Sequence, residues 1–180
     1  MVYVLLGTGF EEMEALAPID LLRRAGIDVL TVGVNGKVVY GGHKIGFEAD
    51  ITIEEMDLTN LDMIVLPGGL GGVASVRASQ DAMEALRFAW ENDKFVAAIC
   101  AGPTVLADLG ITDGRKATCY PGCESGMGSA VMVPDAPCVR DGKLITGTSA
   151  GCAIPFGLAL IEAVKGEAAA KTVSDQIVIR

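Results

Sequence analysis

The stretch AAICAGPTVLA, residues 97–107, joins a buried-strand pattern to a cysteine and the start of a helix. Small apolar residues lead directly to Cys100, and Ala-Gly-Pro follows it. Pro103 suits the first turn of a helix, where its missing N–H donor costs little. The pattern therefore predicts a strand that turns sharply into a helix at Cys100. On such a turn a cysteine is exposed at the edge of a sheet beside backbone N–H groups, as in the nucleophile elbow of hydrolases.

Strand and helix patterns alternate on both sides of this turn. Short apolar runs predict strands at residues 2–6, 27–34, 63–66 and 95–99. Apolar residues at helical spacing predict helices at residues 11–25, 80–91 and 152–164, near Cys100, and from residue 167. This alternation favours an α/β three-layer sandwich, with a mostly parallel sheet and helices on both faces.

Two regions interrupt the alternation. Residues 35–50 are rich in glycine and predict a hairpin or a pair of extended loops, followed by a further strand at residues 51–56. Residues 113–149 contain scattered glycines, prolines and short apolar runs, which predict loops and antiparallel edge strands. Because no repeat or linker stands out, we expect a single domain over residues 1–180.

The composition disfavours several classes of protein. With 14 Lys and Arg against 23 Asp and Glu, the formal net charge of −9 disfavours binding to nucleic acid and to anionic membranes. No apolar stretch reaches the roughly 18 residues of a membrane span, and the amino terminus lacks a secretion signal. Five cysteines, an odd number, indicate free thiols. We therefore expect a cytoplasmic protein whose partners are small molecules or proteins.

Unusual residues follow three of the predicted strands. GTGFEEMEA follows the first strand, LPGGLGG follows a middle strand, and Cys100 follows the next one. Because the carboxyl ends of parallel strands meet at one edge of a sheet, we expect these segments to converge. The positive end of the following helix favours thiolate, so we expect a lowered pKa at Cys100. The alternative is a cysteine that only fills space in the core.

Taken together, these motifs resemble those of the ThiJ/PfpI superfamily, specifically the branch that contains the parkinsonism-associated deglycase. The resemblance runs nearly end to end and rests on EEMEA with IDLLRRAGI, on VLPGG, on AAICAGPTVLA and on GTSAGCAIPFGLALIEAV. It implies a flavodoxin-like fold of the kind shared with class I glutamine amidotransferases. It also implies a homodimer and chemistry without a cofactor.

The same resemblance implies roles for particular residues. It makes Cys100 the reactive cysteine and Glu14 a buried glutamate that hydrogen-bonds it. The backbone N–H groups of Gly68, Gly69 and Ala101 would line an oxyanion pocket. Burial beside a thiol raises the pKa of a carboxyl, so Glu14 would act first as a hydrogen-bond donor. The alternatives are an ordinary charge on an amphipathic helix for Glu14 and a simple turn for the two glycines.

The branch usually has a histidine before proline where this sequence has CYPG, so Tyr120 stands at that position. Tyrosine is a poor proton acceptor at neutral pH, although it can orient a substrate or donate a hydrogen bond. The chain's single histidine, His43, and Arg24 match positions near the dimer interface, from which His43 would approach the partner subunit's Cys100. Alternatively, His43 is a surface-loop residue and Arg24 complements the end of its helix.

The other cysteines suggest fewer roles. Cys119 and Cys123 have a C-x3-C spacing, and Cys152 lies in a motif that the resemblance brings near the cysteine turn, where it would serve as a resolving thiol. Cys138 has no assigned role. Zinc needs four good ligands, which these spacings do not supply, so no metal is expected. LPGGLGG lacks the Lys-Ser or Lys-Thr of a P-loop, which disfavours nucleotide binding.

Two functions from different classes fit these residues. The first, implied by the resemblance, is a cysteine-dependent, cofactor-free enzyme of the glyoxalase or deglycase type, which acts on small reactive aldehydes such as methylglyoxal or on their adducts. The second is a non-enzymatic oxidative-stress sensor or chaperone-like protein that uses an oxidisable Cys100. A third is an amidotransferase-like subunit or scaffold whose cysteine serves a partner.

Overall fold

The computed structural model describes residues 1–179, in which seven strands form one central sheet with the order β10-β11-β7-β6-β1-β2-β5. The strands are β1 (Val2–Leu6), β2 (Val29–Gly33), β5 (Ile51–Thr52), β6 (Met63–Leu66), β7 (Phe95–Ile99), β10 (Cys138–Asp141) and β11 (Leu144–Gly147). All neighbouring pairs are parallel except β10 with β11. The predicted mostly parallel sheet is confirmed.

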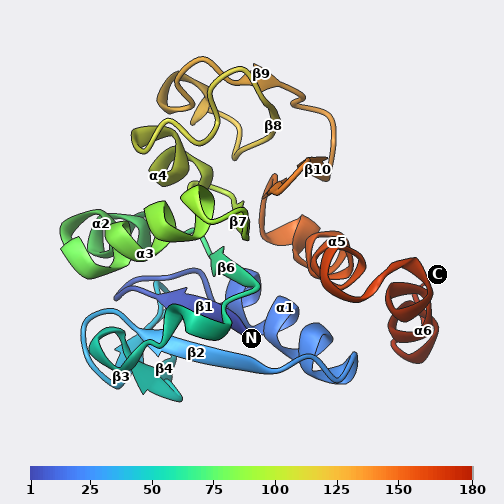
Figure 1. Cartoon of the computed structure of the whole chain (residues 1–180), viewed down its shortest axis with the longest axis horizontal. Coiled ribbons are helices and arrows are strands. Elements are labelled where there is room, and N and C mark those ends of the chain that lie inside the picture. Colours follow the sequence, from blue (N-terminus) through green and yellow to red (C-terminus); the bar gives the residue numbers. More distant parts are fainter. Residues whose placement is uncertain (180) are drawn as a thin grey trace.

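Helices cover both faces of this sheet (Figure 1). One layer contains α1 (Glu12–Arg24), α5 (Ala153–Lys165) and α6 (Glu167–Gln176). The other contains α2 (Leu70–Ala78), α3 (Gln80–Glu91) and α4 (Pro103–Asp108). This arrangement confirms the predicted three-layer, flavodoxin-like α/β fold.

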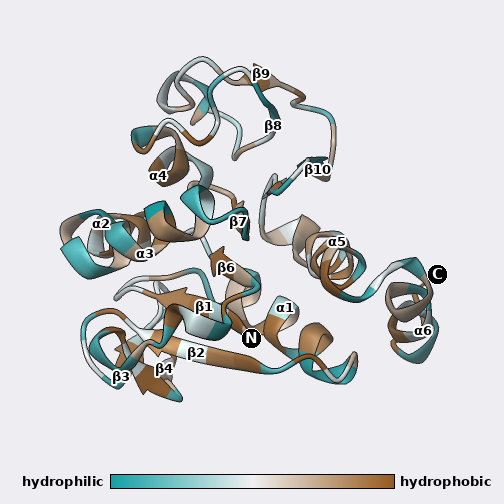
Figure 2. Ribbon diagram, viewed as in Figure 1, coloured by the Kyte–Doolittle hydropathy of each residue, from teal (hydrophilic) through white to brown (hydrophobic). Residues whose placement is uncertain are grey.

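Strand β1 shows why the sheet needs two helical layers. Its side chains alternate between two hydrophobic clusters: Tyr3 and Leu5 pack into one, whereas Val2, Val4 and Leu6 pack into the other. A strand buried on both faces reads as a continuous apolar run, which is how VYVLL reads in the sequence. Figure 2 shows this hydrophobic character along β1 and β2, whereas the ribbon of α3 carries both hydrophilic and hydrophobic residues.

The interrupting regions fold partly as predicted. The glycine-rich segment forms the antiparallel hairpin of β3 (Val38–Tyr40) and β4 (Gly46–Glu48). The strand predicted at residues 51–56 is wrong beyond Thr52, because a capping box between Thr52 and Glu55 starts a 3-10 helix at Ile53–Glu55. Three more 3-10 helices are described, at Leu58–Asn60, Glu124–Gly126 and Ala150–Cys152.

Residues 113–149 also differ in part from the prediction. The antiparallel pair of β10 and β11 is confirmed, but β11 lies inside the sheet, parallel to β7. The strands β8 (Lys116–Ala117) and β9 (Val131–Met132) form a separate parallel pair rather than an antiparallel one. Helix α2 was not predicted, because its two glycines lower its helix propensity.

A close contact between α1 and α5 fixes the position of the first helix. A Cβ at Gly157 would lie 2.6 Å from Leu21 Cδ1 and 3.1 Å from Pro18 Cα, so only glycine lets the two helices approach this far. Helix α1 continues through Pro18 to Arg24. In the part of the chain that the structure describes, no helix is long and apolar enough to cross a membrane.

Candidate active site

Cys100 occupies a strained turn between β7 and α4. Its φ of 64° lies in the left-handed region, which L-residues other than glycine seldom adopt. Its N–H donates to the carbonyl of Gly147 over 3.0 Å, and its carbonyl accepts the N–H of Tyr120 over 2.8 Å. Helix α4 begins just after it, with Pro103 in the first turn. The predicted strand-to-helix turn at Cys100 is confirmed, and neighbouring segments hold it on both sides.

Glu14 lies directly beside this turn. It sits in the first turn of α1, where Glu11 Oε2 caps the helix by accepting the N–H of Glu14 over 2.7 Å. Its side chain is 1% exposed and hydrogen-bonds Cys100. Gly68 donates its N–H to Glu14 Oε2 over 2.9 Å, and the N–H of Ala150 also bonds the carboxyl. The ends of β1, β6 and β7 therefore converge, as the sequence predicts.

Burial controls the ionisation of both groups. It raises the pKa of Glu14 to about 7, against the hydrogen bonds from Cys100 and Gly68 that favour the carboxylate. Burial likewise raises the pKa of Cys100 to about 12, and the negative charge of Glu14 adds to this effect. The predicted lowering of the pKa of Cys100 is therefore wrong, because burial and the adjacent carboxylate outweigh the amides of a short helix. A protonated Glu14 removes the charge repulsion and can donate to the sulfur.

Two backbone N–H groups face the sulfur. Those of Gly69 and Ala101 hydrogen-bond Cys100 and favour its thiolate. The N–H of Gly68 is instead taken by Glu14, so Gly68 positions the acid, which differs from the oxyanion contact expected of it. A surface depression adjoins Ala101 and is also lined by Leu70, Arg77 and Thr104, among other residues. The sulfur thus has amide donors on one side and an acid on another.

The remaining predicted site residues lie less centrally. Tyr120 contacts Cys100 through its backbone, and its side chain is 49% exposed. Arg24 pairs with Asp20 on the exposed surface of α1, with 2.6 Å between Nε and Oδ2. The approach of Arg24 and His43 to a partner subunit stays a prediction.

Within this chain, His43 pairs with a buried carboxylate. His43 Nδ1 lies 2.8 Å from Glu12 Oε2, and the backbone N–H of His43 donates to Glu12 Oε1 over 2.8 Å. The sequence alone predicts no site role for Glu12 or Ala150. Glu12 lies within the quoted EEMEA motif, but only the fold brings it to His43, which lies 31 positions along the chain.

All five cysteines are free thiols. Burial raises the pKa of Cys119 to about 11 and that of Cys138 to about 12. The proximity of Cys152 further disfavours the Cys138 thiolate. Cys152 ends the 3-10 helix that begins at Ala150, whose N–H faces Glu14. Cys119 and Cys138 are therefore mostly protonated at neutral pH.

Replacement of Glu14 by glutamine should remove one step from the pH profile of Cys100 alkylation. In the wild type the pair loses its first proton near pH 7, and part of the singly charged pair holds that charge on sulfur. We therefore expect the alkylation rate to rise near pH 7, level off, and rise again towards pH 12. Glu14→Gln should show one rise, because only the thiol titrates.

Iodoacetamide labelling followed by mass spectrometry of the Cys100 peptide measures these rates. Glu91→Gln, which changes an exposed carboxyl at the end of α3, is the matched control and should keep both steps. A two-step profile that persists in Glu14→Gln would show that another group titrates with the sulfur.

Glu14 also makes the stability of the fold depend on pH. Its folded-state pKa of about 7 exceeds the ordinary value of 4.5, so its favourable contribution to the free energy of unfolding is fully present below pH 4.5 and is lost as the pH rises to 7.

The fold and the site together define a class of α/β proteins with a cysteine on a strand-to-helix elbow and a buried acid against its sulfur. Residues 1–163 match the DJ-1/PfpI family. The chain belongs to this family, which confirms the resemblance stated from the sequence.

Relatives from distant organisms match almost the whole chain. Drosophila melanogaster protein dj-1beta is 35% identical over 98% of this chain and 95% of its own length. The crystal structure of Drosophila DJ-1beta has a TM-score of 0.95 and 34% identity, covering 99% and 97% of the two chains. A structure of oxidized Toxoplasma gondii DJ-1 has a TM-score of 0.93 and 31% identity, covering 98% and 97%. A Pyrococcus abyssi protein named as a deglycase is 33% identical over 83% of this chain and 90% of its own length.

Proposed function

We propose that this protein is a cysteine-dependent, cofactor-free enzyme of the glyoxalase or deglycase type that acts on small reactive aldehydes. The observation that supports it best is the hydrogen-bonded pair of Cys100 and Glu14 at the strand-to-helix turn, with the N–H groups of Gly69 and Ala101 on the sulfur. A relative named as a deglycase adds support. We also propose that residues 1–180 form one domain. We propose a cytoplasmic location, where a reducing environment keeps the cysteines as thiols.

The reaction with methylglyoxal begins with attack of the Cys100 sulfur on the aldehyde carbon. A C–S bond forms, and the carbonyl electron pair moves to oxygen, where the amides near Gly69 and Ala101 stabilise the charge. Glu14, whose pKa of about 7 lets it hold a proton at neutral pH, donates that proton to the new oxyanion. The product of this step is a neutral hemithioacetal on Cys100.

A proton shift and a hydrolysis complete the turnover. Glu14, now a carboxylate, removes the proton from the former aldehyde carbon and returns it to the neighbouring carbon through an enediol. The hydroxyl proton of the former aldehyde carbon moves to the oxygen of the neighbouring carbon, which leaves a lactoyl thioester. The aldehyde carbon is thereby oxidised and the ketone carbon reduced, so no external oxidant is required. Water then cleaves the C–S bond, releases lactate and restores the Cys100 thiol. For glycated thiols and amines, the Cys100 sulfur instead displaces the thiol or amine from the hemithioacetal or hemiaminal carbon: a C–S bond to Cys100 forms, the original C–S or C–N bond breaks, and Glu14 gives its proton to the leaving group.

The alternative is a non-enzymatic sensor in which Cys100 is oxidised to a sulfinate. The same acid supports it, because a protonated Glu14 can donate to a sulfinate oxygen. A DJ-1 relative has been solved in an oxidized form. In that case the protein would gain two oxygen atoms at Cys100 from peroxide and would not turn over aldehyde.

Proton NMR of a methylglyoxal incubation distinguishes the two functions. The enzyme predicts that lactate accumulates well beyond one molecule per chain. The sensor predicts no such accumulation, together with a mass gain of two oxygen atoms on the Cys100 peptide after peroxide treatment. Lactate that does not exceed the amount of protein would overturn the enzymatic proposal.

We also propose a homodimer that uses an apolar surface over α1, the hairpin and α5. This surface comprises the exposed side chains of Met13, Leu16, Ile45 and Ile154, which are 60%, 37%, 55% and 43% exposed. They line one continuous depression. A contiguous apolar patch of this kind is typical of an interface rather than of a free surface.

Leu16→Glu should convert the dimer to a monomer. A charge placed in an apolar interface without a partner costs several kcal/mol, enough to shift a micromolar dimer by orders of magnitude. Light scattering after size exclusion measures the change. Val131→Glu is the control, because Val131 is 52% exposed on β9, outside this surface. A wild-type chain that elutes as a monomer would contradict the proposal.

A further inference from the structure

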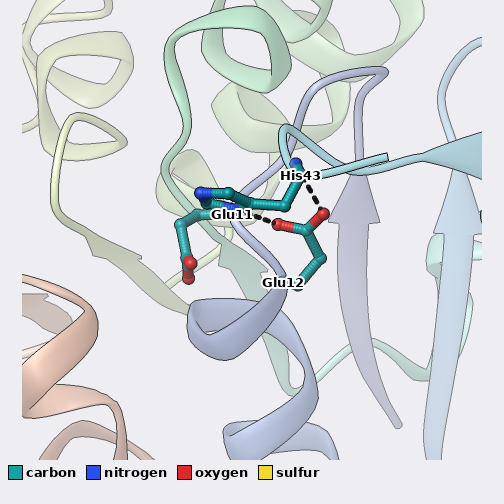
Figure 3. A group of neighbouring side chains, drawn as sticks. All are labelled: Glu11, Glu12 and His43. Carbon is teal, nitrogen blue, oxygen red and sulfur yellow. Dashed lines mark hydrogen bonds and ion pairs between the residues drawn. The ribbon is translucent and has the colours of Figure 1, made fainter. Parts of the chain in front are cut away.

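A group of three metal-ligating side chains lies beside the active site and is not used by the proposed reaction. Glu11, Glu12 and His43 each offer one ligand atom, and these atoms all lie within 4.8 Å of one another. Figure 3 shows the His43 ring facing the Glu12 carboxylate, with Glu11 beside them. The two glutamates come from the start of α1, and His43 comes from the loop between β3 and β4.

The structure holds two of these ligands in place through the backbone. The N–H of His43 donates to Glu12 Oε1 over 2.8 Å, so the loop and the carboxylate are joined independently of the ring. A Cβ at Gly41 would lie 2.2 Å from the same oxygen, so only glycine leaves room for Glu12 there. Glu11 is fixed by its cap to the N–H of Glu14. A ligand set held in this way loses little conformational freedom when an ion binds.

Glu12 is also an unusual carboxylate. It is only 5% exposed, and His43 contacts both of its oxygen atoms, one through the ring and the other through the backbone N–H. A buried carboxylate that faces an imidazole offers the oxygen and nitrogen ligands that zinc binds.

We propose that Glu11, Glu12 and His43 bind a divalent transition-metal ion of the zinc class. Zinc binds imidazole nitrogen and carboxylate oxygen at about 2.0–2.2 Å in tetrahedral geometry, so two of its ligand atoms lie about 3.4 Å apart. His43 Nδ1 and Glu12 Oε2 now lie 2.8 Å apart as an ion pair, so they need to separate by only about 0.6 Å to bind the ion. Two carboxylates and a neutral imidazole balance the charge of the ion, which takes the place of the proton between His43 and Glu12.

The location connects this ion to the reactive cysteine. The N–H of Glu11 donates to the carbonyl of Gly68 over 3.0 Å, and the N–H of Gly68 donates to Glu14. Three protein ligands leave a coordination position open to water or to a substrate oxygen. The site is therefore connected to the Cys100 pair through the backbone of Gly68 and is separate from it.

The single histidine makes the test specific, because the imidazole NMR signals of this chain belong to His43 alone. Zinc is titrated into chelator-treated wild-type protein while these signals are followed. We expect them to shift and to saturate at one ion per chain. The five cysteines also bind zinc, but thiol binding alone leaves the imidazole signals in place.

Three variants give the comparison. Glu11→Gln, which retains an oxygen for the helix cap, and Glu12→Gln should each weaken the binding seen at His43 by about tenfold or more. Glu91→Gln should bind as the wild type does. The proposal would be overturned by imidazole signals that do not move with excess zinc, or by equal binding in both ligand variants and the control. This outcome is independent of lactate formation, so it leaves the proposed function to its own test.

Discussion

Replacing Cys100 by serine is expected to lower kcat/KM for lactate formation from methylglyoxal by at least about 1,000-fold. A serine hydroxyl remains almost fully protonated near neutral pH, because it is a far weaker acid than a thiol, so the variant lacks the strong sulfur nucleophile. The hydroxyl can accept the N–H groups that face the sulfur, so the pocket keeps its shape. The measurement is the initial rate of lactate formation under matched substrate concentrations.

Cys138→Ser is the matched control, because Cys138 is also a partly buried thiol but is not part of the proposed mechanism. Its rate should stay within a factor of about two of the wild type. Peroxide treatment of Cys100→Ser should add no pair of oxygen atoms at that position. Lactate formation that survives in Cys100→Ser would exclude the covalent mechanism and would place the chemistry on another group.

The second large effect is expected for Gly68→Ala, with a loss of about 100-fold or more in kcat/KM. The added Cβ would lie 2.5 Å from Glu14 Oε2, 2.7 Å from Cys100 Cβ and 3.1 Å from its sulfur. Contacts this short force the acid and the thiol apart. Gly68 does not have a positive φ, so alanine brings no backbone strain and the loss is attributable to these contacts.

A control glycine separates this effect from a general loss of folding. A Cβ at Gly42 would meet its nearest atoms at 3.5 Å and 3.6 Å, which are ordinary contacts, and Gly42 also lacks a positive φ. Gly42→Ala should therefore keep its activity within about twofold. The alkylation profile of Gly68→Ala should change as well, because Glu14 no longer touches the sulfur. A fully active Gly68→Ala would contradict the close packing of the pair.

The sequence predicts most of the fold, since its central strands are buried on both faces. Runs such as VYVLL and FVAAI, where they alternate with amphipathic helices, predict central strands of a parallel sheet. The sequence does not predict helix α2, because its glycines lower the helix propensity of a short segment that is stabilised by burial of Val73 and Val76. The strand at residues 51–56 was overextended, because a local capping contact at Thr52 outweighs its β-propensity.

For the site, the sequence predicts which residues lie together better than it predicts their pKa values. It places Cys100 and Glu14 together from their strand ends and from the family resemblance. The pKa of Cys100 was misjudged, because burial depends on side chains from distant segments that no local pattern displays. The bond from Gly68 to Glu14 was missed for the same reason, since 54 positions separate the two residues. Glu12 and His43 meet only after the hairpin folds onto the first helix.

The left-handed backbone at Cys100 lowers the stability of the fold while it presents the reactive sulfur. An L-residue in this conformation costs about 1–2 kcal/mol relative to glycine, so every folded molecule carries that penalty at this one position. Glycine would adopt this conformation without that penalty, but it would remove the sulfur. A thiol at this position is what a chain needs if the chemistry of this atom matters more than the last kcal/mol of stability.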